Sequence, residues 1–199
     1  MLKLPDKGSF GYFDKKKKIN LTASVLSFLA VMIIYVTGIL IYGNNKSIFT
    51  VIAAVSVLPA ARILISYIII APYKSLSADR YEKLCLITGE NDASRILCDI
   101  LLTSEEKSMI AGTVVIYEGN ILMFSENKKA DPRAVENYMK KILETCNYSS
   151  VKMYTDYDQF QKKLQRCAAH NQTEKDENSR QRLKTMCERI EHTIFLYTV

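Results

Sequence analysis

The feature that most constrains this fold is a long block of the chain that carries almost no charge. Between Ile19 and Tyr73 there are two charged residues, Lys46 and Arg62. Residues 19–42 form an uncharged run of 24 residues. A helix needs about 20 apolar residues, at ~1.5 Å each, to cross a hydrocarbon core of ~30 Å. We therefore predict a transmembrane helix over residues 19–42.

A secretory signal peptide is the alternative interpretation of this first apolar run. Lys15 to Lys18 precede it and resemble the basic region of such a peptide. The apolar region of a signal peptide is typically ~7 to 15 residues long and is followed by small residues at the cleavage site. Residues 19–42 are longer and lead into Gly43-Asn44-Asn45. The length favours an uncleaved membrane helix.

A second apolar run, residues 48–72, predicts a second transmembrane helix, although Pro59 and Arg62 interrupt it. Proline kinks a helix, and membrane helices tolerate such kinks where neighbouring groups satisfy the freed carbonyl. The connection over residues 43–47 is short and polar. So short an external loop makes the two helices antiparallel, as a hairpin.

The charge distribution predicts the orientation of this hairpin. The net charge is +4 over residues 1–18, +2 over residues 19–73 and zero over residues 74–199. The loop of the hairpin contains one lysine, Lys46. Seven basic residues flank its two outer ends: Lys15, Lys16, Lys17, Lys18, Lys74, Arg80 and Lys83. Because positive charge is retained in the cytoplasm, we expect a multi-pass protein of the cell membrane with the N-terminus (basic, residues 1–18) and the C-terminus cytoplasmic.

Composition also bears on the partners. Five cysteines without paired spacing indicate reduced thiols in a cytosolic compartment. A soluble part with no net charge argues against nucleic acid as a partner, since nucleic-acid binding needs a clustered basic face. The lipid bilayer is the expected partner, and Lys15 to Lys18 would also attract anionic lipid at its surface. A homo-oligomer or another membrane protein is the further partner that we consider.

Arg62 is the residue within the membrane block that needs a physical reason. It lies about 11 residues, or roughly 16 Å, from the cytoplasmic end of the second helix. In an antiparallel hairpin its expected neighbours are Ser24 and Ser27 of the first helix. A buried intramembrane arginine indicates a functional or assembly site, because its insertion costs ~2.5 kcal/mol or more. The alternative is that its long side chain extends to the headgroups.

The rest of the chain predicts a small cytosolic α/β domain with a mixed sheet over residues 74–169. A polar linker over residues 170–179 and a C-terminal helix and strand over residues 180–199 complete it. The first expected elements are a strand over residues 83–88 and a helix carrying Ile96, Leu97, Ile100 and Leu101. A hairpin of residues 113–118 and 121–125 follows, with a type II′ turn at Gly119-Asn120, and then a helix that starts at Asp131-Pro132. The last expected elements are a strand over residues 151–154, a helix capped near Asp156, a helix carrying Leu183 to Ile190 and a strand over residues 193–197.

Catalytic motifs are sparse in this domain. There is no phosphate-binding glycine loop and there are two histidines, so we predict no cofactor and no metal site. One tripeptide, Glu126-Asn127-Lys128, follows the second strand of the expected hairpin and resembles the ExK element of restriction-endonuclease-like nucleases. That resemblance implies a metal-holding acidic residue on the preceding strand, where this chain has Ala111-Gly112-Thr113. Glu126 and Lys128 are therefore weak catalytic candidates.

Three hypotheses for function remain open on the sequence. The leading one is a two-pass integral membrane protein that tethers a non-catalytic cytosolic α/β domain, which makes protein or ligand contacts at the inner membrane face. The alternative is a membrane-anchored nuclease of restriction-endonuclease-like fold, active or degenerate, that uses Glu126 and Lys128. The third is a small channel or transporter subunit built around Arg62.

Overall fold

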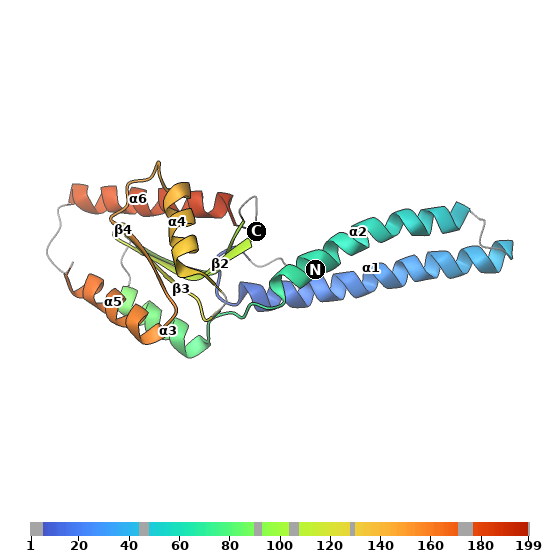
Figure 1. Cartoon of the computed structure of the whole chain (residues 1–199), viewed down its shortest axis with the longest axis horizontal. Helices are drawn as coiled ribbons and strands as arrows, with labels where there is room; N and C mark the ends of the chain where they lie inside the picture. The colour runs from blue at the N-terminus through green and yellow to red at the C-terminus, as the bar shows by residue number, and fades with distance from the viewer. Residues whose placement is uncertain are drawn as a thin grey trace. The chain divides into compact units, whose positions relative to one another are not determined.

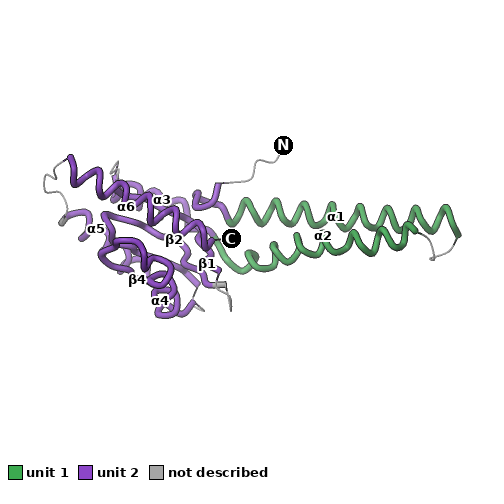
Figure 2. Tube along the Cα trace, turned by 90° about the horizontal axis from the view of Figure 1, so that it is seen from above, with its two compact units in different colours: residues 1–5, 13–74 green, residues 6–12, 75–199 purple. Residues whose placement is uncertain are grey.

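The structure, a computed structural model, describes residues 6–43, 48–89, 93–103, 108–127, 130–170 and 177–198. Its contacts divide the chain into two compact units (Figure 2). The first unit contains Phe13–Lys74, and the second combines Asp6–Tyr12 with Ser75–Val199. The apolar helices and the α/β part thus fall in different units. A short segment ahead of the apolar block belongs to the α/β unit.

The first unit is an antiparallel pair of long apolar helices, α1 (Tyr12–Tyr42) and α2 (Ile48–Ile70). Each is long and apolar enough to cross a membrane. Compared with the predicted spans, α1 begins earlier, at Tyr12, and α2 ends at Ile70. The basic stretch of residues 15–18 is therefore helical and continuous with the apolar run. The predicted loop over residues 43–47 lies outside the described residues except for Gly43.

Small side chains allow α1 and α2 to pack closely. The buried positions of the pair include Ser24 and Gly38 on α1 and Ala53 and Ala60 on α2. Small residues at a helix interface let the two backbones approach, which increases van der Waals contact in an apolar environment. Aromatic pairs lie near both ends of the hairpin: Phe13–Tyr73 at 6.1 Å and Tyr42–Phe49 at 5.9 Å between ring centroids.

The second unit is built on a mixed sheet, as predicted, and this sheet has four strands in the part of the chain that the structure describes. Its strands are β1 (Ser94–Thr103), β2 (Ser108–Tyr117), β3 (Asn120–Phe124) and β4 (Ser150–Tyr154), in the order β1-β2-β3-β4. The first three are antiparallel neighbours, and β4 pairs parallel to β3. The parallel connection runs through α4 (Pro132–Ile142), because parallel strands need a crossover.

Helices cover both faces of this sheet (Figure 1). α4 and α6 (Glu177–Leu196) pack on one face, and α3 (Ala78–Thr88) and α5 (Tyr157–His170) pack on the other. Successive residues of a strand point to opposite faces. Accordingly, Val114 and Ile116 join the core under α4 and α6, whereas Val115 and Tyr117 join the core under α3 and α5. Both faces of the central strands are buried, which makes them almost entirely apolar.

Two predicted elements near the start of the α/β unit are wrong in type. Residues 83–88, predicted as a strand, form the second half of α3. The segment with Ile96, Leu97, Ile100 and Leu101, predicted as a helix, is β1. A strand that is buried on both faces presents a continuous apolar run, and its spacing does not distinguish it from a helix. In α3, Leu84 and Thr88 are buried one turn apart, as a helical face requires.

The C-terminal part also differs from the prediction. Residues 193–196 continue α6, and beyond this helix Thr198 forms an antiparallel bridge with Leu102 of β1 while the Tyr197 carbonyl accepts the backbone N–H of Thr103. The buried side chains of Ile190 and Ile194, four residues apart, carry the helix through this segment. Of the predicted linker over residues 170–179, His170 ends α5 and residues 177–179 begin α6, whereas residues 171–176 lie outside the described residues.

The expected β-hairpin and the helix start at Asp131 are confirmed. The β2–β3 connection, however, has Glu118 and Gly119 at its centre, with φ of 47° and 82°. Two successive positive φ values are those of a type I′ turn, in place of the predicted type II′ turn. At the start of α4, the Asp131 carboxylate accepts hydrogen bonds from the backbone N–H groups of Arg133 and Ala134, with Pro132 at the first helical position.

The segment Asp6–Tyr12 is an integral part of the α/β unit. The backbone N–H of Cys98 in β1 donates to the Gly8 carbonyl at 2.9 Å, and the Lys7 ammonium donates to the Thr198 carbonyl at 2.7 Å. Phe10 stacks on Tyr81 of α3, with 4.6 Å between ring centroids. This segment and the C-terminal end thus satisfy backbone groups along the outer edge of β1, which an open sheet would leave unpaired.

Candidate functional site

Glu126, the nuclease-like candidate, takes part in an exposed ion pair. Its carboxylate is bonded to the guanidinium of Arg80 on α3. That guanidinium also lies 4.7 Å from the ring centroid of Tyr157, whose hydroxyl donates to the Arg80 carbonyl. The partner of Glu126 is therefore a cation, and the contacts connect α3 with α5. Lys128 lies outside the described residues.

The acidic residue that a nuclease site needs is missing from the described neighbourhood of Glu126. Ala111, Gly112 and Thr113 lie in β2, where Thr113 pairs with Phe124 of β3. Among the described residues, no three His, Cys, Asp or Glu side chains come together as a metal site would require. The geometry around Glu126 supports a structural ion pair better than a hydrolytic centre.

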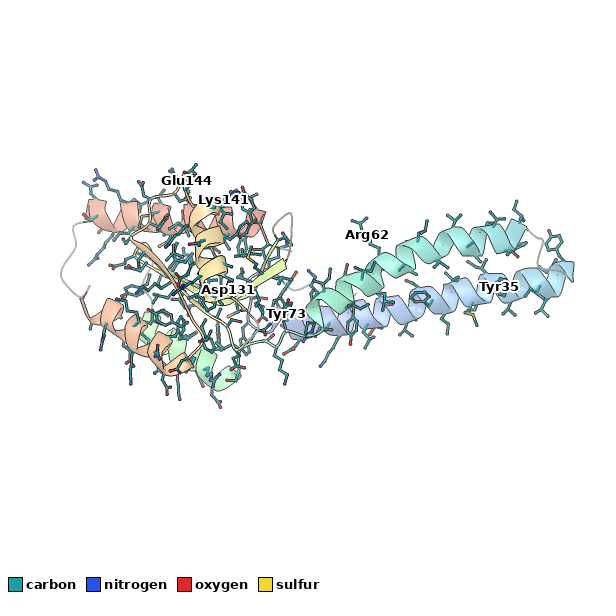
Figure 3. All side chains as sticks on the ribbon, viewed as in Figure 1. Tyr35, Arg62, Tyr73, Asp131, Lys141 and Glu144 are labelled. Carbon is teal, nitrogen blue, oxygen red and sulfur yellow. The ribbon has the colours of Figure 1, made fainter. Side chains whose placement is uncertain are left out.

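The structure does not bring Arg62 together with Ser24 and Ser27. Arg62 is exposed, and its side chain points away from the helix pair (Figure 3). Ser24 is buried between α1 and α2, with 3% of its surface exposed. The Ser27 hydroxyl donates to the carbonyl of Ala23 in its own helix, at 2.8 Å. The expected depth of Arg62 is compatible with the hairpin, but its helical face is the outer one.

Arg62 belongs to a regular stripe on that outer face of α2. The stripe repeats every three or four residues, and each of its members is exposed: Val55, Leu58, Arg62, Ile65 and Ile69. Such spacing places side chains along one line of a helix, as in helices that pack lengthwise against a neighbour. We call these five residues the α2 outer stripe.

The four lysines before the apolar run do not all have the same surroundings. The Lys17 ammonium donates to the Tyr73 carbonyl, just beyond the end of α2, and lies 3.8 Å from the Asp14 carboxylate. Lys15 and Lys18 are exposed, and Lys16 is half-buried. Lys17 thus connects the start of α1 with the end of α2. Lys15 and Lys18 are exposed, as a contact with a membrane surface would require.

The residues that sequence reasoning missed lie in a bulge of β1. Cys98 and Asp99 occupy the irregular part of the β1–β2 pairing, between Leu97 and Ile100. Asp99 is 3% exposed and has a φ of 58°, which few residues other than glycine adopt. Its carboxylate accepts a hydrogen bond from the Ser75 hydroxyl at 2.6 Å. The available signal was one carboxylate inside an apolar run that the sequence analysis assigned to a helix.

The electrostatics of this bulge keep the neighbouring thiol protonated. Burial, followed by the negative charge of Asp99 and the nearby Cys85, raises the pKa of Cys98 to about 12. A thiol in this state is neither a nucleophile nor a metal ligand at neutral pH. The bulge is therefore a structural junction, and its chemistry is that of hydrogen bonding.

A cavity beside α6 is the best candidate for a ligand site in the α/β unit. Its volume is about 470 Å³, within the range of small-molecule sites. Arg182 and Arg189 contribute cationic groups, Asn147 and Gln181 contribute amides, and Met186 contributes apolar surface. Guanidinium and amide donors around an apolar floor suit a small anionic ligand.

Comparison with known proteins gives no family assignment: no family model, no curated protein and no solved structure matches this chain. The residues themselves are therefore the basis for a functional proposal.

Proposed function

We propose that this chain is a two-pass integral membrane protein that tethers a non-catalytic cytosolic α/β domain, which makes protein or ligand contacts at the inner membrane face. The observation that carries the proposal is the position of residues 6–12 within the α/β unit. Residues 6–11 precede α1 and Tyr12 is its first residue, whereas the rest of the unit follows α2. Parts of one folded unit must lie on the same side of a membrane, so the chain between them crosses it an even number of times.

The same observation argues against a cleaved signal peptide. Cleavage after the apolar run would remove residues 6–12 from the mature chain. The Cys98 backbone N–H would then lose the Gly8 carbonyl, and Tyr81 would lose its stacking partner Phe10. A buried backbone donor without a partner destabilises a fold by about 1–3 kcal/mol. Retention of the helix pair is the consistent alternative.

The cytoplasmic side is supported by the charges around the helix pair. Lys15 to Lys18 begin α1, and Lys74 follows α2, whereas the connection between the helices contains Lys46 alone. Positive residues stay in the cytoplasm during insertion. The five cysteines of the α/β unit are free thiols, which suits a reducing compartment.

We propose a non-catalytic domain because the candidate catalytic groups already have structural roles. Glu126 is bonded to Arg80, and the Cys98 thiol is buried and protonated. The cavity beside α6 offers donors for an anionic ligand but, among its described lining residues, no acid–base pair for catalysis. Binding is thus the activity that the described geometry supports best.

A topology experiment tests the proposal. A fluorescent protein that matures only in the cytoplasm, fused after Val199, should fluoresce in whole cells. A cysteine introduced at Gly43 should react with a membrane-impermeant maleimide added outside the cells, and one introduced at Asp14 should not. Reversed labelling, or a dark C-terminal fusion, would contradict the two-pass topology.

A further inference from the structure

The charge of Arg62 has no acidic counterpart in the apolar parts of the two helices. From Lys15 to Ala78 the sequence contains no aspartate or glutamate. Arg62 is exposed on the outer face of α2, between Leu58 and Ile65 of the α2 outer stripe. In the two-pass arrangement proposed above, on which this inference rests, that face meets the hydrocarbon. A charged group at this depth needs a partner, because the hydrocarbon offers neither hydrogen bonds nor a counter-ion.

A second copy of this chain is a poor partner for the α2 outer stripe. It would bring another Arg62 to the same depth and no carboxylate, so the two like charges would repel each other across the interface. The polar groups that it could offer near that depth are serine, threonine and tyrosine hydroxyls, and some of these already donate to carbonyls of their own helix, as Ser66 does to Arg62 and Ser56 to Ile52. Hydroxyls also leave the positive charge unneutralised.

We propose that the α2 outer stripe docks a transmembrane helix of another protein, one that carries an aspartate or glutamate at mid-depth. Val55, Leu58, Ile65 and Ile69 supply apolar contacts on either side of Arg62, and the acidic residue supplies the counter-charge. A charge pair shielded from water is strong and directional, especially with the forked donor of arginine. The spacing of the stripe matches the contact line of a helix packed lengthwise.

A designed helix provides the probe. A leucine-rich transmembrane helix with one central glutamate is expressed with a red fluorescent protein at its cytoplasmic end, together with the full chain carrying a green fluorescent protein after Val199. Versions of the probe with glutamine or leucine at the centre serve as controls. Energy transfer should be strongest for the glutamate probe, corresponding to roughly 3- to 15-fold tighter association than the leucine probe.

Variants of the chain then locate the interaction. Arg62→Leu should reduce transfer from the glutamate probe to that of the leucine probe, and Arg62→Glu should instead prefer a probe with a central arginine. Leu58→Phe, on the α2 outer stripe, should weaken transfer. The matched change Leu29→Phe, at an exposed position on α1, should leave it unchanged.

The outcomes separate this inference from the topology on which it rests. A bright green fusion with equal transfer to all three probes would overturn the inference and leave lipid phosphate as the partner of Arg62. Transfer between two differently labelled copies of the chain that falls on Arg62→Leu would identify a second copy as the occupant, and would also overturn it. A dark green fusion would reject the two-pass topology itself.

Discussion

The Ser75 hydroxyl donates a 2.6 Å hydrogen bond to Oδ2 of Asp99, a buried carboxylate in the bulge of β1. Ser75 is the first residue of the α/β unit after the apolar helices. The preceding bulge residue, Cys98, donates its backbone N–H to Gly8, four residues before α1 starts. Two adjacent residues of one strand thus hold both the segment that leads into the helix pair and the segment that leaves it.

Replacing Asp99 should therefore loosen this junction. Asp99→Ala removes the acceptor for Ser75 and places a residue with a Cβ but no local hydrogen bond at a φ of 58°. We expect a loss of about 2–3 kcal/mol in the free energy of unfolding. Asp99→Asn keeps an acceptor and a side chain that tolerates positive φ, so its loss should be smaller. Thermal unfolding of the full chain in detergent measures both.

A matched control for Asp99 is Asp79, an exposed acidic residue in the first turn of α3. Asp79→Ala should change stability by less than about 1 kcal/mol, the scale of a favourable charge at a helix N-terminus. If Asp99→Ala were no more destabilising than Asp79→Ala, the junction would not depend on this carboxylate.

Gly112 provides a test of the other side of the bulge. It lies in β2 opposite Ile100, has a φ of 68°, and a Cβ added there would overlap the Phe124 carbonyl oxygen. Gly112→Ala should destabilise the chain by about 3 kcal/mol or more, from strain and overlap together. Gly11→Ala, at a φ of 73° but with open space around the added Cβ, should cost only about 1 kcal/mol. Equal losses would show that backbone strain alone matters at both sites.

The parts of this fold that the sequence predicted are those governed by local signals. The apolar length of the helix pair, the Asp131-Pro132 helix start and the alternating β2–β3 hairpin each follow from a few adjacent residues. β1 could not be predicted in this way. It is buried on one face by α6, from a distant part of the chain, and on the other by α3, so its apolar spacing carries no strand period.

The candidate sites show the same division. The position of Arg62 along the apolar block could be read from residue counts, but its outward direction depends on which face of α2 packs against α1. The Arg80–Glu126 pair joins residues 46 positions apart, and the Gly8–Cys98 bond joins residues further apart still. Contacts of this kind depend on the complete fold, and no local pattern reports them.

The Cys98 thiol makes stability depend on alkaline pH. Its folded-state pKa is about 12, raised from an ordinary value of 9.0 mainly by burial. The unfolded chain loses this proton first, so the thiol contributes stability below pH 9 that is lost as the pH rises from about 9 to about 12. At pH 10.5 the loss from this group is about 2 kcal/mol. Melting temperatures measured from pH 8 to 10.5 should fall more steeply for the unchanged chain than for Cys98→Ala, while Cys167→Ala keeps the original slope.

Substitutions in the Arg80–Glu126 ion pair distinguish the proposed binding domain from the alternative hypothesis of a nuclease. Both side chains are substantially exposed, 54% for Glu126 and 38% for Arg80, so Glu126→Ala should change the free energy of unfolding by less than about 1 kcal/mol. Arg80→Ala should cost more, because it also removes the guanidinium from the face of Tyr157. The purified full chain, incubated with plasmid DNA and magnesium chloride, should leave the DNA uncut. Magnesium-dependent cleavage that disappears on Glu126→Ala, with unfolding unchanged, would instead establish Glu126 as a catalytic residue and reject the non-catalytic proposal.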